Sequence, residues 1–452
     1  MRTLYLFTLA AMASGAAFAA TIERVGNDEA DWTDESIWSP SAPTSSDDVR
    51  LWTAAITNSS SDVSVNNLGL KGDATLNILG GAFNVAQTFY QYQSNVNISG
   101  TAAITLQNGE YYFGEDADSL SAGSLNVYGS SSITASGNGK AIYIGYNSVN
   151  NDYVANFYGD STAKGRIKIG SEVADSGASS TMNVYERAKI NADYINFYQN
   201  ATLNASGNAV ITATNDLRLH DMASSTAGIV NISDSASLTA QNAYVGDGTI
   251  VTVSGNATFK TTQFVYLGTD YLLNSSGEGH LILKDHATFQ TSQNLRMVNA
   301  STLTLEGSNV TVNLQALGGG ISTADAKIRF VSDASGISKI TSRYCAYVDA
   351  ANETGFELEF DFSNLALAEG TYTFDVITFT ENATREKTII ANYASMSEDL
   401  IAVVKANEGD SYEFIADGLT LKLVYTVVPE PATYAAIFGV LALVFAAFRR
   451  RK

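Results

Sequence analysis

Only one cysteine, Cys345, occurs in the 452 residues of this chain. An intramolecular disulfide is therefore excluded, and stability has to come from packing and strand pairing. Cys345 lies in the segment SRYCAYVD, whose apolar and aromatic residues suggest a strand, and no histidine in that segment could act as its base. We interpret Cys345 as a small buried residue and not as a nucleophile.

Proline is almost as scarce as cysteine. The four prolines are Pro40, Pro43, Pro429 and Pro431, so the stretch between Thr44 and Val428 has none although it is rich in glycine. Because proline cannot donate a hydrogen bond to a β ladder, this absence favours continuous strand pairing. Antiparallel sandwich domains remain the alternative fold.

Basic residues are also few. The chain has 26 Lys and Arg against 46 Asp and Glu, and a formal net charge of −20 at pH 7. Such a surface repels phosphate backbones, which argues against nucleic acid as a partner. The hydrophobic content of 45% supports a real core, so the chain is not a disordered stalk.

The N-terminal residues have the layout of a secretory signal peptide. Arg2 is followed by an apolar run from Leu4 to Met12, and then by small residues that end in Ala17-Phe18-Ala19. We expect residues 1–19 to be a signal peptide, with Ala17 and Ala19 forming the signal peptidase site. The alternative is an N-terminal membrane anchor, for which the apolar run is short.

The C-terminal residues 428–452 combine three features in order. Pro429-Glu430-Pro431 is followed by an uncharged stretch, 432–448, and then by a basic tail, 449–452. As a helix the uncharged stretch would rise about 25 Å, the short end of what crosses a hydrocarbon core of about 30 Å. We expect a transmembrane helix, with the basic tail retained on the cytoplasmic side by Arg449, Arg450, Arg451 and Lys452.

This combination resembles the PEP-CTERM sorting signal of Gram-negative bacteria that make exopolysaccharide. The resemblance implies that an exosortase, a membrane-embedded cysteine transpeptidase, recognises Pro429, Glu430 and Pro431 and cuts nearby. The implied partners are the exosortase and the inner membrane during sorting, and afterwards exopolysaccharide or other surface proteins. The implied destination is the cell surface or extracellular matrix. A permanent single-pass anchor is the alternative.

The middle of the chain is a repeat. Segments such as LNILGGA, VNISGTA and LNVYGSS share one pattern of an apolar residue, a polar residue, two strand-forming residues and a turn. They lie at 76–82, 96–102, 125–131, 155–161, 182–188, 203–209, 230–236, 251–257, 281–287 and 303–309. Each is followed by two more short alternating stretches, for example SLTAQ and AYVGD.

Three short strands and three turns in about 20 to 30 residues are the content of one rung of a β-solenoid. We therefore predict an all-β chain with a right-handed parallel β-helix of three strands per rung at 67–320. Asparagine occupies the second position of many repeats, and we expect these residues to form an internal ladder of hydrogen-bonded amides. They are Asn77, Asn97, Asn126, Asn156, Asn183, Asn204 and Asn231.

Different sequence character flanks the repeats. Residues 20–66 hold all three tryptophans, Trp32, Trp38 and Trp52, which we interpret as a cap on the first rung; an aromatic sugar-stacking platform is the alternative. This segment loosely resembles the start of bacterial surface proteins with autotransporter-associated strand repeats. Gly318-Gly319-Gly320 marks a boundary, after which longer alternating strands at 321–427 predict a small antiparallel β region or cap.

Residues suited to catalysis are scattered. Four aspartates follow third strands, where aspartate serves as a turn residue: Asp116, Asp221, Asp247 and Asp270. The segment GEDADS has Glu115, Asp116 and Asp118 but lacks the other ligands of a calcium loop. We assign no catalytic residue.

The histidines His220, His280 and His286 show no zinc-ligand spacing. We assign no metal and no cofactor. The expected function is a structural or adhesive surface protein associated with exopolysaccharide. The alternative is a carbohydrate-active β-helix enzyme, either a polysaccharide lyase or a glycosidase.

Overall fold

The structure is a computed structural model of the whole chain. It describes residues 20–25, 28–52, 54–114, 122–137, 139–173, 176–219, 228–246, 248–269, 277–319, 326–345, 356–381, 384–395, 400–406, 409–428 and 431–449. Ala17 and Ala19 of the expected signal peptide, Pro429 and Glu430 of the tail motif, and Arg450, Arg451 and Lys452 of the basic tail lie outside these residues.

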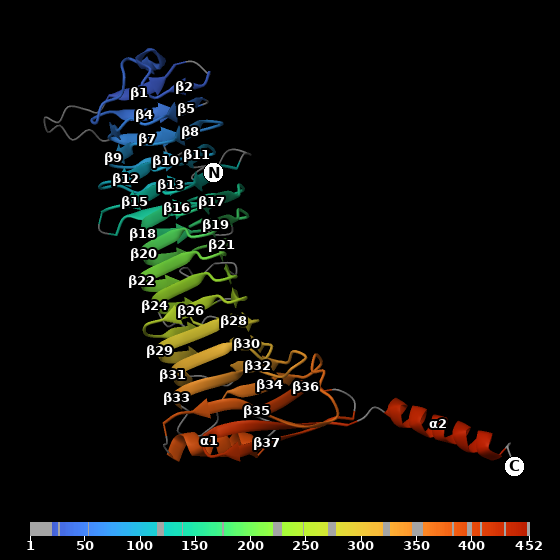
Figure 1. Ribbon diagram of the computed structural model, residues 1–452. Helices are drawn as coiled ribbons and strands as arrows, with labels where there is room; N and C mark the ends of the chain where they lie inside the picture. Colours follow the sequence, from blue (N-terminus) through green and yellow to red (C-terminus); the bar gives the residue numbers. More distant parts are fainter. Residues whose placement is uncertain are drawn as a thin grey trace, which may run out of the picture.

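The fold is all-β, and its strands stack into a long parallel β-solenoid (Figure 1). One sheet has 15 strands and forms one side of the stack. Its strands are β2 (Ala30–Asp31), β5 (Ala55–Asn58), β8 (Thr75–Ile78), β11 (Asn95–Ile98), β14 (Ser124–Val127), β17 (Tyr153–Phe157), β19 (Ser180–Val184), β21 (Ala201–Ala205), β23 (Ile229–Ile232), β25 (Thr249–Val253), β28 (Gly279–Lys284), β30 (Thr302–Glu306), β32 (Lys327–Val331), β34 (Glu357–Asp361) and β36 (Ile401–Lys405).

The other sheet has 23 strands. They are β1 (Thr21–Arg24), β3 (Trp38–Ser39), β4 (Asp48–Leu51), β6 (Val63–Val65), β7 (Asn67–Leu70), β9 (Ala82–Val85), β10 (Phe89–Gln91), β12 (Ala103–Leu106), β13 (Tyr111–Phe113), β15 (Ser132–Ala135), β16 (Ala141–Ile144), β18 (Thr162–Ile169), β20 (Lys189–Phe197), β22 (Val210–Arg218), β24 (Ser237–Val245), β26 (Thr258–Thr261), β27 (Val265–Leu267), β29 (Thr288–Met297), β31 (Thr311–Gly319), β33 (Lys339–Cys345), β35 (Gly370–Phe379), β37 (Ser411–Asp417) and β38 (Thr420–Val427). The helices are a short 3-10 turn (Glu35–Ile37), α1 (Thr384–Ala394) and α2 (Pro431–Arg449).

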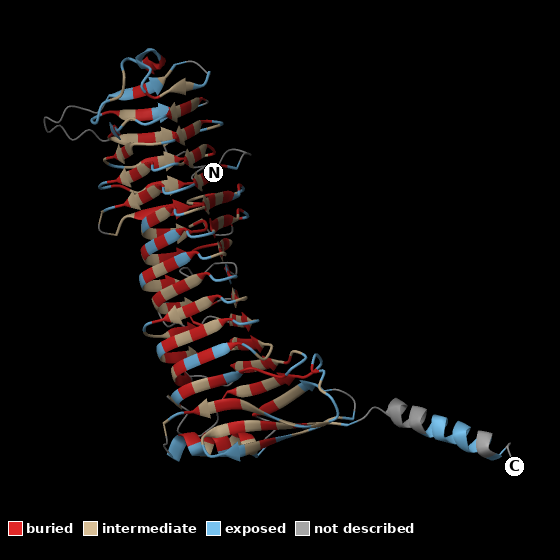
Figure 2. Cartoon of the chain, in the orientation of Figure 1, coloured by how far each residue is buried: buried red, intermediate tan, exposed pale blue. Residues whose placement is uncertain are grey.

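Alternation along each strand builds the core. In β8, Leu76 and Ile78 are fully buried, while Thr75 and Asn77 on the other face are half-buried. The parallel register then places Leu76 beside Val96 of the next rung, so apolar side chains meet their counterparts above and below. Figure 2 shows the same alternation of buried and half-buried residues along the whole stack.

The rungs change form along the stack. Early rungs have three strands, such as β8, β9 and β10, as the sequence predicts. In β18 the second and third strands fuse, because Thr162–Lys164 pairs with β15 and Arg166–Ile169 pairs with β16. A register shift near Gly165, whose φ of +131° suits glycine, keeps both pairings possible across the bend.

The parallel ladder extends beyond the interval 67–320 at both ends. It begins with β2 and β5, before residue 67, and continues past Gly320 through β32, β34 and β36. Among the described strands, antiparallel pairing is confined to β1 with β3 and to β38 with β35 and β37. The antiparallel region that the sequence predicts is therefore present, and it is smaller than 321–427.

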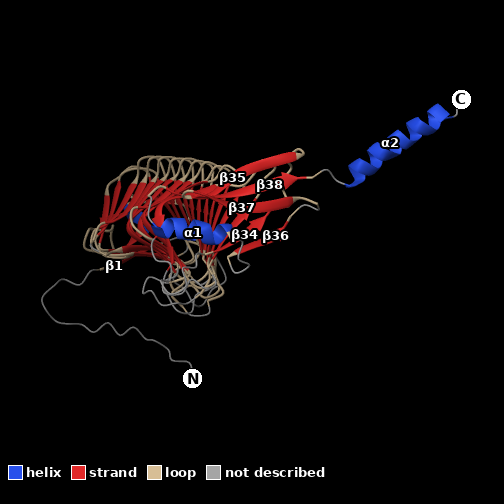
Figure 3. Ribbon diagram, turned by 90° about the horizontal axis from the view of Figure 1, so that it is seen from below, coloured by secondary structure: helices blue, strands red, loops and turns tan. Residues whose placement is uncertain are grey.

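Each end of the stack carries a cover. At the N-terminal end Trp32 and Trp38 are 6% and 5% exposed, and the Trp38 indole donates to the Trp32 carbonyl at 3.0 Å. At the other end α1 contacts β37 and β38 and lies across the last rungs (Figure 3). Tyr393 of α1 donates its hydroxyl proton to the Phe356 carbonyl at 2.7 Å. These covers shield sheet ends that would otherwise offer unpaired edges.

The helix α2 occupies the stretch where the sequence predicts a helix, 432–448. In the described part of the chain, however, none of the helices combines the length and apolarity needed to cross a membrane. The structure thus confirms a helix at 432–448, and its crossing of a membrane stays a prediction.

Candidate binding surface

One column of outward-facing side chains on the 23-strand sheet gathers aromatic and cationic residues. The parallel register aligns one residue from each rung, and we call this column the aromatic-cationic stripe. Its members are Arg50, Gly69, Tyr90, Tyr112, Tyr143, Lys168, Asn196, Arg218, Tyr244, Tyr266 and Arg296. Because each strand presents every second residue to solvent, the fold alone places these residues in line.

The tyrosines of the stripe stack on one another. The ring centroids of Tyr90 and Tyr112 lie 5.3 Å apart at 12°, and those of Tyr112 and Tyr143 lie 4.8 Å apart at 20°. Farther along, Tyr244 and Tyr266 stack at 4.9 Å and 3°. The spacing follows the distance of about 4.8 Å between parallel strands, so the rings form two stacked runs in the column, one from Tyr90 to Tyr143 and one from Tyr244 to Tyr266.

Cations lie against this surface. Lys168 Nζ is 4.5 Å from the ring centroid of Tyr143, and Arg296 Cζ is 5.3 Å from that of Tyr266. Both distances suit cation–π attraction. Burial alone would lower the pKa of Lys168, but its hydrogen bond to the Tyr143 hydroxyl at 3.0 Å and nearby charge raise that pKa. Lys168 is therefore charged at neutral pH.

The tyrosine hydroxyls stay protonated in this setting. Burial, with help from the nearby Asp216 carboxylate, raises the pKa of Tyr244 to about 12. Burial and a hydrogen bond to Glu110 raise the pKa of Tyr112 further above its ordinary value. The one hydroxyl proton of Tyr112 is donated to Glu110, so of these two hydroxyls that of Tyr244 can donate a hydrogen bond to a ligand at neutral pH.

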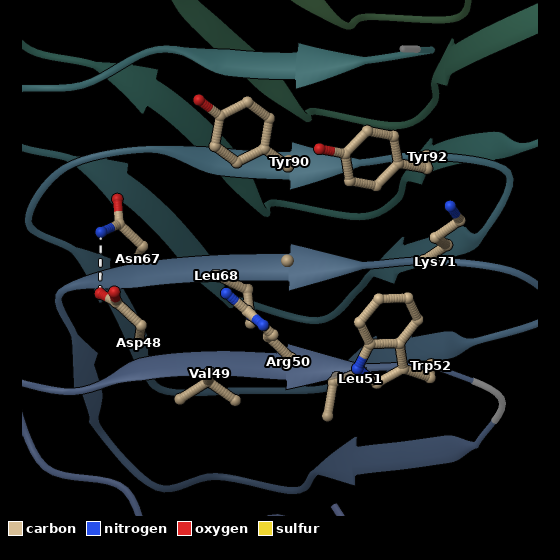
Figure 4. Close-up of a pocket in the computed structure, with 11 residues that line it drawn as sticks. Asp48, Val49, Arg50, Leu51, Trp52, Asn67, Leu68, Lys71, Tyr90 and Tyr92 are labelled. Atoms are coloured by element: carbon tan, nitrogen blue, oxygen red, sulfur yellow. Dashed lines mark hydrogen bonds between the residues drawn. The ribbon is translucent and has the colours of Figure 1, made fainter. Parts of the chain in front are cut away.

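A hollow interrupts the stripe near its N-terminal end. Its volume is about 510 Å³, and it lies between β4, β7 and β10 (Figure 4). Trp52 is 46% exposed at its edge, and the side chains of Arg50, Lys71, Tyr90 and Tyr92 surround it. The Tyr90 and Tyr92 rings are nearly parallel, with centroids 6.0 Å apart. A rigid sheet thus presents three aromatic rings and two cations around one opening.

The charged side chains around the hollow differ in how many hydrogen bonds they make. Lys71 Nζ lies 5.9 Å from the ring centroids of both Trp52 and Tyr92. The Asp48 carboxylate accepts hydrogen bonds from Asn67 at 2.8 Å and from Asn66 at 2.9 Å. Among the described residues, no hydrogen bond or ion pair engages the exposed Arg50 side chain. The hollow therefore offers a cation for a ligand, while its carboxylate is already occupied.

Glycine at position 69 creates the hollow. Gly69 aligns with Arg50 on one side and Tyr90 on the other, so any side chain there would fill the gap. A Cβ atom at Gly69 would meet nothing closer than the Val49 carbonyl oxygen at 3.8 Å, an ordinary contact, and its φ lies outside the left-handed region. The backbone thus has no need of glycine here, and the missing side chain only keeps the hollow open.

The opposite side of the stack carries the predicted asparagine ladder. Each amide donates to the amide oxygen one rung before, from Asn97 to Asn77 at 2.9 Å through to Asn231 to Asn204 at 2.9 Å. The intermediate bonds measure 2.8 to 3.0 Å. The expectation of an internal ladder is wrong in one respect: Asn77 lies between the buried Leu76 and Ile78, so the ladder faces outward.

Charged pairs follow the asparagines on the same face. They include Lys284 with Glu306 at 2.8 Å, Lys327 with Glu357 at 3.1 Å and Arg329 with Glu359 at 3.1 Å. Each pair joins neighbouring rungs. Because amides and charges on this face are paired with each other, the face serves the stack itself, and the stripe is the better candidate for binding.

Cys345 is buried at the end of β33, with 6% of its surface exposed, as the sequence predicts. Burial, aided by the neighbouring Glu386 carboxylate, raises the pKa of the thiol to about 12. The Glu386 side chain accepts a hydrogen bond from the Cys345 amide at 3.0 Å. A buried and protonated thiol is a poor nucleophile.

Of the histidines and acidic residues weighed from the sequence, the structure describes His280 and His286. His280 lies 3.5 Å from Glu278, and His286 lines a second, polar hollow of about 720 Å³ between turns. In the parts of the chain that the structure describes, no group of three or more His, Cys, Asp or Glu side chains could hold a metal ion. The other candidates lie outside the described residues: His220, Glu115, Asp116, Asp118, Asp221, Asp247 and Asp270.

Sequence reasoning did not identify the stripe as a site. Its signal is visible in the third segment of several repeats, where AIYIG, AYVGD and FVYLG each place a tyrosine between two apolar residues. Alternation predicts that these tyrosines face outward, and only the register shows that they fall in one column.

No family model, no curated protein and no solved structure matches this chain.

Proposed function

We propose that this chain is an exported structural or adhesive protein of the cell surface or extracellular matrix, sorted by an exosortase and associated with exopolysaccharide. The observation that carries the proposal is the ladder of the 15-strand sheet, which runs unbroken from β2 to β36. Fifteen strands, with fourteen spacings of about 4.8 Å, give a rod of roughly 67 Å. A rod with nearest-neighbour contacts and covered ends suits a spacer or scaffold.

The sequence ends support the export part of the proposal. Residues 1–19 have the layout of a signal peptide, and Pro429-Glu430-Pro431, the apolar helix α2 and the basic residues Arg449 to Lys452 follow the rod in the order of a PEP-CTERM signal. On this proposal the inner membrane and an exosortase are partners only during sorting. We also propose that the rungs wind in the right-handed sense, which nearly all parallel crossover connections adopt.

The experiment is intact-mass and C-terminal peptide analysis of the protein from its native cells. We expect mature forms that begin near Ala20 and end near Pro429. Replacing Glu430 with alanine should leave the C-terminus uncut, while the control Val428→Ala, at an exposed neighbouring position, should be processed normally. A mature surface form that still ends in Arg450-Arg451-Lys452 would contradict the proposal.

A carbohydrate-active enzyme is the competing function. The proposal of a non-enzymatic role rests on the self-paired outer face of the 15-strand sheet and on the buried, protonated Cys345. Incubating the purified protein with acidic and neutral glycans tests it directly. Reproducible depolymerisation by the folded protein, and none by a heat-denatured control preparation, would replace the structural role with an enzymatic one.

A further inference from the structure

We propose that the hollow above Gly69, continued by the Tyr90–Tyr112–Tyr143 stack, binds a segment of an acidic polysaccharide whose sugars carry carboxylates. This inference rests on the proposed function and names the ligand class and the site for it. The chain would lie along the stripe, with one sugar seated in the hollow. Three independent features of the described residues support it: shape, aromatic surface and charge.

The shape of the hollow suits a sugar. A volume of about 510 Å³ falls within the range of roughly 300 to 1,000 Å³ that is typical of small-molecule sites. The hollow is open along the stripe, since Gly69 has no side chain and Tyr90 follows in register. A polymer can therefore enter and leave without threading through the protein.

The aromatic surface suits the faces of sugar rings. A pyranose ring has apolar C–H faces and polar edges, and tyrosine and tryptophan offer a matching apolar face with a polar tip. Trp52 is the one tryptophan of the three with a large exposed fraction, 46%. The Tyr90 ring stacks on Tyr112 on one side and lies beside Gly69 on the other, so its face toward the hollow can cover a sugar ring, and the rest of the polysaccharide chain passes along the edges of the stacked rings.

Charge favours an acidic polymer over a neutral one. Arg50 and Lys71 border the hollow, and the Asp48 carboxylate opposite is held by two amides. The net charge of −20 repels polyanions at long range, but at about 0.15 M salt the screening length is only about 8 Å. Local cations therefore dominate at the hollow. Nucleic acid, with a charge every 1.7 Å or so of axis, is repelled more strongly than a polymer with one charge per sugar.

The test is affinity electrophoresis of the purified full chain in gels that contain a polyuronate or, as the matched arm, a neutral glucan. We expect retardation by the polyuronate that weakens as salt is raised, and at least tenfold weaker retardation by the glucan. Protection of Trp52 from acrylamide quenching provides a second readout, because Trp32 and Trp38 are buried. Equal retardation by both polymers would overturn the acidic assignment.

Variants locate the site. Gly69→Val should fill the hollow and weaken polyuronate binding tenfold or more without unfolding, since its Cβ has room. Thr134→Val adds the same side chain on another outward column of this sheet and should bind like the unmodified chain. Arg50→Ala should reduce the preference for the polyuronate over the glucan. Normal binding by Gly69→Val, with an unchanged far-UV spectrum, would sink the inference.

Two further outcomes are decisive. If sedimentation shows that Trp52→Ala abolishes a dimer, a second copy of this chain occupies the hollow and the polysaccharide assignment fails.

The hollow lies far in sequence from Pro429-Glu430-Pro431, so the binding proposal and the sorting proposal can fail independently of each other. A correctly processed protein that ignores polyuronates refutes only this inference, and a binding protein with an intact C-terminus refutes only the sorting proposal.

Discussion

The amide of Asn126 donates a hydrogen bond to the amide oxygen of Asn97, 3.0 Å away on the preceding rung. Asn156 in turn donates to Asn126 at 2.9 Å, so each interior asparagine of the ladder is both donor and acceptor. Asn97 and Asn126 also align in the register between β11 and β14. A single rung therefore shares its side-chain bonds with both neighbours, which makes the ladder a repeated brace along the 15-strand sheet.

Breaking this brace should cost a measurable amount of stability. Asn126→Ala removes two inter-rung hydrogen bonds at a half-buried site, and we expect a loss of about 1 to 2 kcal/mol in the free energy of unfolding. The measurement is the denaturant midpoint. Thr252→Ala is the control, because among the described residues its side chain makes no hydrogen bond although it lies in register with Asn231. Equal effects of both changes would show that the ladder contributes nothing.

The three tryptophans should separate into two classes. Trp32 is buried against Trp38 and against Phe83, with ring centroids 4.8 and 4.9 Å away. Truncating a buried ring costs about 3 to 5 kcal/mol, so we expect Trp32→Ala to lower the thermal midpoint strongly and to loosen the first rungs. Trp52→Ala, at an exposed site, should change stability by less than about 0.5 kcal/mol. A large loss for Trp52→Ala would contradict the division.

The thiol of Cys345 should resist labelling and make stability depend on alkaline pH. Its folded pKa of about 12 lies above the unfolded value near 9. Its stabilising contribution is therefore complete below about pH 9 and is lost as the pH rises toward 12, by about 1 kcal/mol at pH 10. Denaturation of the unmodified chain and of Cys345→Ala between pH 7 and 10 measures the difference. Parallel pH profiles would refute the shift, as would rapid thiol labelling of the folded protein.

Asp333 should make the turns near β30 and β32 sensitive to acid. Burial alone would raise the pKa of its carboxylate, but hydrogen bonds from Ser308, Ser335 and Gly336 outweigh burial and lower it. The contribution of a lowered pKa is present above the unfolded value near 3.9 and is lost as the pH falls through the folded value. We expect Asp333→Asn to cost about 1 kcal/mol at pH 7 and progressively less below pH 4.

Denaturation at several pH values, from 7 down to 3, measures this convergence. The control is Asp73→Asn, because Asp73 is exposed and makes no hydrogen bond among the described residues. That change should have little effect at any pH. A cost for Asp333→Asn that stays constant down to pH 3 would show that the carboxylate is not held in its charged form.

Local patterns made the solenoid predictable. The repeat of Leu76, Asn77 and Ile78, renewed in every rung, fixes which residues face the core, because strand alternation has a period of two. The same repeat predicts the amide ladder. The repeat alone did not show which way the Asn77 side chain points. Asn77 faces outward because Leu76 and Ile78 on either side of it face the core.

Other features depend on contacts between rungs that the sequence does not state. The ladder continues past Gly320 because β30 pairs with β32. Lys327 and Arg329 of β32 form ion pairs with Glu357 and Glu359 of β34, the next strand of the ladder. Fusion of two strands at Gly165 depends likewise on the positions of β15 and β16. Long-range register, not local propensity, decides both.

By itself the sequence determined the class of fold, the buried state of Cys345 and the helix at the C-terminal end, because burial alternation, scarce proline and an uncharged run are local properties. The tertiary structure decided where side chains from distant rungs meet. Gly69, Tyr90 and Trp52 are unremarkable in the chain, and only parallel stacking brings them around one hollow. The physical reason is that register places residues some 20 positions apart within about 5 Å of each other.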